Sequence, residues 1–184
     1  LNVDLTTVAP DTVPQIMERY MTEIDELYTV CTNGKHDICC STYGIPVYNA
    51  LVRHAGEDSV WQVTHIGGHR MTGTMIAFPQ GIYYGHLDAL NAEEIATNHR
   101  AGYLLTHKYR GRSAYGNHAL DVDTHRAVGA VDYHIREVTK KYAMDDLMLE
   151  KVESLGGMQW RVQFLDKQGM SYESQVTTTL SEPR

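Results

Sequence analysis

The segment LYTVCTNGKHDICC, residues 27–40, contains every cysteine of the 184-residue chain. Its first part, LYTVC (27–31), is β-branched and aromatic, which predicts a buried strand that ends at a cysteine. TNGKHD (32–37) is rich in turn-forming residues and predicts a loop. A helix is predicted to follow over residues 38–54. Because Pro46 lies inside that span, we expect the helix to start or kink there.

The following residues predict the rest of an α/β core. SVWQVTH (59–65) predicts a second strand, and GTMIAF (73–78) and GIYYGHL (81–87) predict the two strands of a hairpin. Residues 91–106 predict a helix, with Asn91 as a candidate cap. The order strand, helix, strand, hairpin, helix is close to a thioredoxin-like core, in which helices flank a mixed sheet.

Helices and a loop are predicted in the regions before and after this core. Residues 14–24 have apolar side chains at helical spacing, and residues 109–117 predict a loop. A long helix is predicted over residues 121–142, with one apolar face. The members of that face are Val128, Val131, His134, Ile135 and Val138.

The last part of the chain predicts a small antiparallel sheet, because Trp160, Val162 and Phe164 alternate with polar residues. We therefore predict three regions: an N-terminal lead-in (1–26), the thioredoxin-like core (27–113) and a C-terminal helix and β extension packed on that core (114–184).

Composition restricts the possible partners. Hydrophobic residues make up 42% and charged residues 21% of the chain, and the formal net charge is −7. We expect no nucleic-acid partner because the sequence has no block of lysine and arginine. We expect no membrane span because no apolar run approaches about 18–20 residues. The acidity keeps the protein soluble or steers a basic redox partner.

The cysteine count indicates the redox state of the compartment, and the first residue indicates whether the chain is a fragment or a processed product. Three cysteines, two of them adjacent, suit a disulfide framework poorly, so we expect a reducing, cytoplasmic setting and no signal peptide. Because the chain begins at Leu1 and not at Met, we expect a fragment or a processed product.

Four side chains form a candidate metal site. Cys31 and Cys40 are separated by eight residues, and His65 and His69 by three. Two thiolates and two imidazoles can bind zinc, or a 2Fe–2S cluster in which two histidines replace two cysteines on one iron. Cys31 and His65 both fall at predicted strand ends, where side chains can converge above one edge of a sheet.

Two other functions remain open at this point. Zinc-finger histidine pairs usually lie on a helix, and the Ile-Gly-Gly between His65 and His69 is poor helix material, so the spacing disfavours a finger without excluding structural zinc. Cys39 or Cys40 at a helix N-terminus could be a reactive thiol paired with His36. No third residue that would orient such a pair is recognisable. Adjacent cysteines also cannot act as a Cys-x-x-Cys redox pair.

The segments VCTNGKHDICC, VWQVTHIGGHRMTGTMIAFPQGIYYGHLD and YRGRS resemble the sucrase/ferredoxin-like family, from about Leu27 to Ser113. The resemblance implies a thioredoxin-like ferredoxin domain that binds a 2Fe–2S cluster. The ligands that it implies, matched by position, are Cys31, Cys40, His65 and His69, with Cys39 as a neighbour of the cluster. Members of the family usually have a substantial region before the cysteine motif, so we expect that region to be absent here.

The function implied by the resemblance is one-electron transfer rather than catalysis. The expected partner is a redox protein of unknown identity, and a homodimer is possible by analogy. Sucrase activity is improbable, because glycoside hydrolysis needs two carboxylates that flank a bond and no such pair is recognisable. Four basic residues are candidates for a positive surround of the cluster, although for each of them a solvated surface charge is the preferred interpretation: Lys35, Arg70, Arg110 and Arg112.

Overall fold

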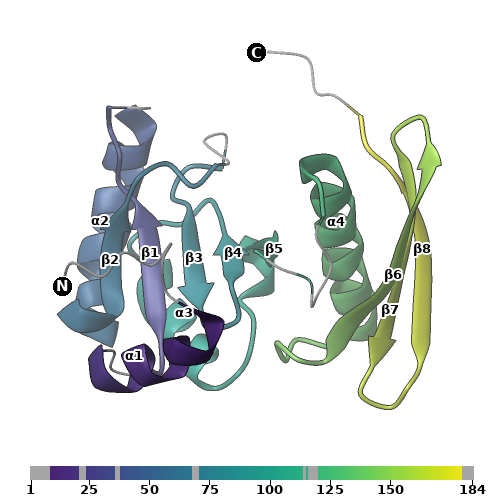
Figure 1. Ribbon diagram of the computed structural model, residues 1–184. Coiled ribbons are helices and arrows are strands. Elements are labelled where there is room, and N and C mark those ends of the chain that lie inside the picture. Colours follow the sequence, from purple (N-terminus) through teal and green to yellow (C-terminus); the bar gives the residue numbers. More distant parts are fainter. Residues whose placement is uncertain are drawn as a thin grey trace.

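The computed structural model describes residues 9–20, 24–35, 38–67, 71–113, 115 and 120–179 (Figure 1). Its helices and strands follow the order expected for an α/β core with a C-terminal extension. The core contains α1 (Val13–Tyr20), β1 (Leu27–Cys31), α2 (Ile38–Ala55), β2 (Val60–Val63), β3 (Met75–Phe78), β4 (Ile82–Tyr84), α3 (Asn91–Arg100) and β5 (Tyr109–Arg112). The extension contains α4 (Val122–Thr139), β6 (Leu147–Gly156), β7 (Gln159–Asp166) and β8 (Ser171–Thr177). Short 3-10 turns at Pro10–Thr12, Glu57–Ser59 and Thr106–Lys108 complete the described elements.

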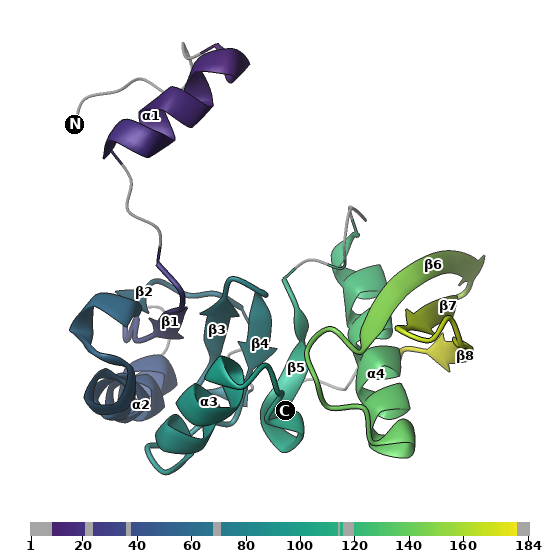
Figure 2. The ribbon, with the colours of Figure 1, turned by 90° about the horizontal axis from the view of Figure 1, so that it is seen from below.

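The first sheet is mixed and has five strands, in the order β2-β1-β3-β4-β5. β1 and β2 pair in parallel, and the other neighbours pair antiparallel. Figure 2 shows α2 and α3 on the same face of this sheet. The predicted α/β fold with a thioredoxin-like core is therefore confirmed.

The parallel pairing of β1 and β2 determines where the metal centre can form. A parallel connection must carry the chain back along the sheet, and α2 makes this return. Alternate residues of β1, Tyr28 and Val30, are completely buried, and Val47 and Leu51 of α2 are buried in the same core. As a result, the C-terminal ends of β1 and β2 and the start of α2 lie at one end of the sheet, the upper end in Figure 1.

The helix α2 begins at Ile38, which confirms the helix predicted over residues 38–54. Pro46 lies inside it, so of the two alternatives at Pro46 a helix start is excluded. The helix α3 is shorter than its prediction and ends at Arg100. Gly102 two residues later adopts φ +77°, a left-handed conformation that ends helices. Asn91 is the first residue of α3 instead of its cap, and its side chain accepts a hydrogen bond from the backbone N–H of Asp88.

β5 corrects the sequence prediction, because residues 109–112 form an edge strand where a loop was expected. Arg112 pairs with Ile82, and Tyr109 pairs with Tyr84. Tyr109 and Gly111 alternate with two partly exposed arginines along the strand. The sequence did not indicate this alternation of buried and exposed residues, because arginine and glycine do not favour strands strongly.

The C-terminal extension places α4 between β5 and a second, antiparallel sheet of order β6-β7-β8 (Figures 1 and 2). Trp160, Val162 and Phe164 are buried, which confirms the predicted alternation in β7. The predicted apolar face of α4 is only partly correct, because His134 and Val138 are exposed.

The buried face of α4 instead contains an ion pair. Arg136 and Asp132 are both 0% exposed, and Nε of Arg136 donates to Oδ1 of Asp132 at 2.7 Å. The hydroxyl of Tyr109 on β5 donates to the other carboxylate oxygen of Asp132. Arg136 also donates to the carbonyls of Lys141 and Ala143. This network joins the first sheet to the extension through groups that have full hydrogen-bond partners.

Among the described helices, none combines the length and the apolar character needed to cross a bilayer. The predicted region boundaries after residues 26 and 113 stay predictions.

Candidate metal centre

Three of the four predicted ligands lie together at the upper end of the sheet. The Sγ atoms of Cys31 and Cys40 and a ring nitrogen of His65 all lie within 4.8 Å of one another. Sγ of Cys40 is 3.9 Å from Nδ1 of His65. Each donor comes from a different element: the last residue of β1, the first turn of α2 and the loop after β2.

Backbone hydrogen bonds on both sides fix the position of Cys31. Its N–H donates to the carbonyl of Thr74 at 3.1 Å, which extends the pairing of β1 with the segment before β3. The next residue, Thr32, donates its N–H to the carbonyl of Val63 at 3.3 Å. The side chain of Thr32 also donates to the side chain of Gln62. The end of β1 is therefore held between the two strands beside it.

Gly44 lets α2 approach the end of β1 closely. A Cβ atom at this position would lie 2.0 Å from the carbonyl oxygen of Cys31. Real Cβ atoms do not come so near to another atom, and here the obstacle is backbone that cannot rotate away. Only glycine therefore allows the contact that brings Cys40, one helical turn earlier, over Cys31.

The start of α2 suits a thiolate at Cys40. The first turn of a helix has unpaired backbone N–H groups and a partial positive charge, which favour a nearby anion. The hydroxyls of Ser41 and Thr42 both donate to the carbonyl of Ile38, at 2.9 Å each, so they satisfy an acceptor in this turn.

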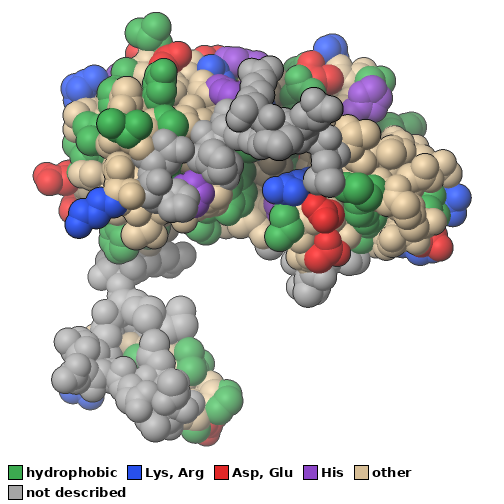
Figure 3. All heavy atoms as spheres, turned by 90° about the horizontal axis from the view of Figure 1, so that it is seen from above, with side chains coloured by type: hydrophobic (Ala, Val, Ile, Leu, Met, Phe, Trp, Pro, Cys, Tyr) green, Lys and Arg blue, Asp and Glu red, His purple; other side chains and the backbone are tan. Residues whose placement is uncertain are grey.

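Burial differs between the donors. Cys31 is 1% exposed and Cys40 is 2% exposed, whereas His65 is partly exposed. Figure 3 looks onto this end of the molecule, where hydrophobic, basic and histidine side chains occur together at the surface. The thiols are thus shielded from water, and the imidazole is the donor that reaches the surface.

The remaining predicted site residues have different outcomes. His69 and Arg70 lie outside the described residues, as does His36 of the thiol alternative. Cys39 is partly buried and does not belong to the group of converging donors. No disulfide joins any of the three cysteines, all of which the structure describes.

Of the predicted positive surround, Lys35 is exposed in the loop before α2. Arg110 and Arg112 lie on β5, which is at the opposite edge of the sheet from β2.

Sequence reasoning missed the residues that position the ligands. Gly44 and Thr74 determine where the thiol of Cys31 lies, yet neither belongs to a ligand motif. In the sequence, Pro46 is the unusual residue of this helix. The close contact that positions the site is instead made by Gly44, two residues earlier.

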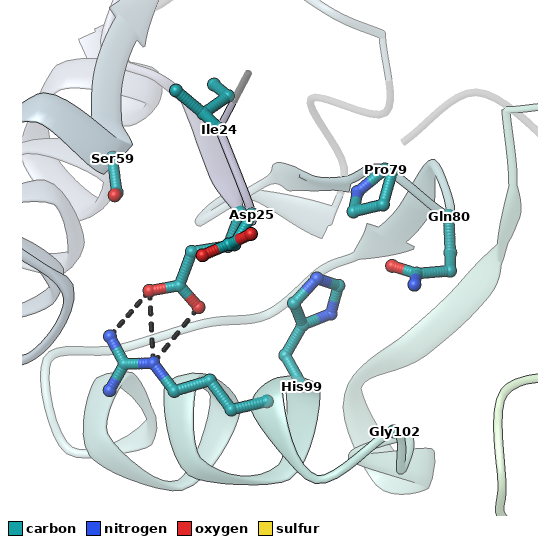
Figure 4. Close-up of a pocket in the computed structure, with 9 residues that line it drawn as sticks. Ile24, Asp25, Ser59, Pro79, Gln80, His99 and Gly102 are labelled. Atoms are coloured by element: carbon teal, nitrogen blue, oxygen red, sulfur yellow. Dashed lines mark hydrogen bonds and ion pairs between the residues drawn. The ribbon is translucent and has the colours of Figure 1, made fainter. Parts of the chain in front are cut away.

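A cavity of about 580 Å³ lies at the opposite end of the sheet from the metal centre (Figure 4). Its lining includes an ion pair of Glu26 and Arg100 at 2.5 Å, and the ring of His99. Nε2 of His99 bonds to the carbonyl of Phe78 at 3.0 Å, and burial lowers the pKa of this imidazole. The histidine is therefore neutral and hydrogen-bonded, as expected of a structural residue.

A sequence model described as sucrase/ferredoxin-like matches residues 2–111, which is more than half of the chain. The chain belongs to the sucrase/ferredoxin-like family. The match includes all of the elements that build the metal centre, from β1 to the loop after β2.

Individual relatives are more distant. The chain is 27% identical over 97 residues to altered inheritance of mitochondria protein 32 of Meyerozyma guilliermondii. The match covers 47% of this chain and 34% of that protein. The chain thus spans about a third of the length of this curated relative.

Among solved structures, a thioredoxin-like [2Fe-2S] ferredoxin from Aquifex aeolicus is 15% identical, with a TM-score of 0.43 over 51% of this chain and 97% of the ferredoxin. A cysteine-to-serine variant of that ferredoxin is 16% identical, with a TM-score of 0.42 over 47% of this chain and 99% of the variant.

Proposed function

We propose that this chain binds a 2Fe–2S cluster and transfers single electrons. The observation that carries the proposal is the convergence of Cys31, Cys40 and His65 from three separate elements. The donor set fits iron, because thiolate and imidazole are the ligands found in mixed 2Fe–2S centres. His69 is proposed as the fourth ligand from its position in the family motif.

Each described ligand has a separate task in this proposal. The two thiols lose their protons on binding iron, and their burial keeps water away from the sulfur atoms. The imidazole of His65 binds through one ring nitrogen and keeps a second nitrogen that can hold a proton. Because His65 is partly exposed, its ring offers a path to the surface for an electron.

The cluster supplies one-electron chemistry, and the ligand types adjust its potential. Neutral imidazoles donate less negative charge than thiolates, so a cluster with two histidines is easier to reduce than one with four cysteines. The known difference between such clusters is on the order of several hundred millivolts. The proposed partner is a redox protein, and a homodimer remains a proposal.

The first test is the colour and composition of the purified protein. We expect red-brown protein with about two iron atoms and two sulfides per chain, the composition of a 2Fe–2S cluster. Colourless protein with one zinc per chain would instead favour a structural metal site. Colourless, metal-free protein whose cysteines react quickly with alkylating agents would favour a thiol enzyme.

The second part of the test replaces one ligand type by the other. His65→Cys should keep the cluster and lower its potential by on the order of 100 mV, because a thiolate replaces an imidazole. His54→Cys changes an exposed histidine at the far end of α2 and serves as the control, with no change in potential. An unaltered potential and spectrum in His65→Cys would show that His65 is not a ligand.

A further inference from the structure

A second cavity, of about 440 Å³, adjoins the loop that carries His65. Part of its lining is Ile66 and Gly67, which follow the ligand His65 in the chain. The rest comes from the segments before β3 and along β4 and β5, and from the first turns of α4. This volume falls within the range of about 300–1,000 Å³ that is typical of pockets for small molecules.

Arg110 brings a positive charge into this cavity. It is partly buried, and its Nη1 donates to the carbonyl of Tyr109 at 2.7 Å. Gly85 makes room for its side chain, since a Cβ there would lie 3.3 Å from Cγ of Arg110 and 3.0 Å from Cβ of Met71. The glycine thus allows Arg110 and Met71 to pack against the same point of the chain.

The charge of Arg110 has no counterion among the residues that the structure describes. Arg126, the other arginine in the described lining, pairs with Asp123 at 3.1 Å. Next to the lining residues Leu120 and Val122, the carboxylate of Asp121 caps α4 and accepts from Thr124.

Burial lowers the pKa of Arg110, because desolvation disfavours its charged form. The guanidinium stays charged in spite of this shift, so it is partly desolvated without a paired anion. Such a group is stabilised by any anion that enters the cavity.

The other walls are apolar or aromatic. Ile66, Met71 and Tyr83 line the cavity, and burial raises the pKa of Tyr83, so its ring carries no charge. Met71, Arg110 and Arg126 also line a smaller neighbouring cavity of about 250 Å³. The two cavities therefore flank Arg110 and share its side chain.

We propose that the larger cavity binds a small organic acid with a ring-shaped apolar body. The anionic group pairs with Arg110, and the ring lies against Tyr83 and Met71. A small molecule is favoured over an acidic protein surface because Arg110 is the one unpaired charge in the described part of the lining and lies within a concave, largely apolar site. This site does not depend on which metal the centre contains.

The experiment uses 1-anilinonaphthalene-8-sulfonate, a ring-shaped acid whose fluorescence rises in apolar surroundings, with the protein as purified. We expect one saturable site per chain. Arg110→Gln should raise the dissociation constant about tenfold or more, because one charge-assisted hydrogen bond is lost. Arg53→Gln, an exposed position in the last turn of α2, is the matched control and should leave the constant unchanged.

Two further measurements make the result decisive. The neutral analogue N-phenyl-1-naphthylamine should bind the natural protein and Arg110→Gln equally, which shows that the cavity is still formed. The proposal is wrong if Arg110→Gln binds the sulfonate as tightly as the natural protein. It is also wrong if a hexaglutamate peptide displaces the probe at lower concentration than naphthalene-1-sulfonate does, since the occupant would then be a protein segment. The iron and sulfide contents of the same samples test the proposed cluster, so a failure of that proposal can be distinguished from a failure of the cavity proposal.

Discussion

Cys39 and Cys40 are adjacent in the sequence, but of these two only Cys40 belongs to the group of converging donors in the candidate metal centre. Successive residues of a helix are rotated by about 100° around its axis, so two neighbours cannot face the same strand. Cys40 is 2% exposed and lies near Cys31, while Cys39 is partly exposed. The thiol of Cys39 could take the position of the Cys40 thiol only if α2 rotated about its own axis. The close contact of Gly44 with the backbone of Cys31 opposes that rotation.

His99 gives a prediction about pH at the scale of a single residue. Burial lowers its pKa from the ordinary value of 6.5, and Arg100 contributes in the same direction. Below the ordinary value the unfolded chain takes up a proton that the folded chain does not. The contribution of His99 to stability is therefore complete at neutral pH and is lost as the pH falls from 6.5 through the folded pKa.

The test compares urea unfolding of the natural protein and His99→Gln at about pH 7.5 and about pH 5.5. The natural protein should lose more free energy of unfolding on acidification than His99→Gln, by about 1.4 kcal/mol for each unit of pKa shift. The exposed His54→Gln is the control and should behave like the natural protein. Equal acid sensitivity of the natural protein and His99→Gln would contradict the assignment.

At the scale of elements, the contact of α2 with β1 brings Cys31 and Cys40 together in the candidate metal centre. Gly44→Ala adds a Cβ that would lie 2.0 Å from the carbonyl oxygen of Cys31, so the helix must move away from the strand. We expect a loss of about 1–3 kcal/mol in the free energy of unfolding, as is typical for overpacking, and a reduced metal content.

Ile45→Ala is the matched control for this helix. Ile45 is the next residue and is 42% exposed, so its truncation should leave the metal content unchanged. Metal analysis and urea unfolding of the two variants check the prediction. Full metal content in Gly44→Ala would show that the centre tolerates a displaced helix.

At the scale of the whole molecule, Asp132 connects the first sheet to α4 of the C-terminal extension. Asp132→Asn leaves the guanidinium of Arg136 buried without a counter-charge and weakens the bond from Tyr109. Removing one partner of a buried ion pair costs about 3–5 kcal/mol. The matched control is Asp123→Asn, which breaks an exposed pair and should cost less than about 1 kcal/mol.

The two tryptophans report on the two parts separately during urea unfolding. Trp61 lies on β2 and Trp160 on β7, so Trp61→Phe leaves only the reporter of the extension. In this background the Trp160 fluorescence and the circular dichroism of the whole chain should show one shared midpoint. Asp132→Asn should lower that midpoint. Two separate midpoints before the substitution would mean that the parts unfold independently.

The sequence allowed prediction of the core and of three side chains that converge in the structure, for identifiable physical reasons. Strands β1 and β2 are short, largely apolar and bounded by turn residues. β1 ends at the predicted ligand Cys31, and β2 ends two residues before the predicted ligand His65. The burial of Asp132 and Arg136 could not be predicted, because charged residues on a helix normally face water. Nor could the position of Gly44 against Cys31, since a close approach depends on how two elements cross.

The packing of α4 against β5 also decides where the first sheet remains open to another chain. A sheet has two edges, and an uncovered edge presents backbone groups that can pair with a foreign strand. With α4 packed against β5, the described elements leave β2 as the other edge, and its Trp61 is 57% exposed. Any assembly that continues this sheet by strand addition must therefore begin at β2, the strand that leads into His65.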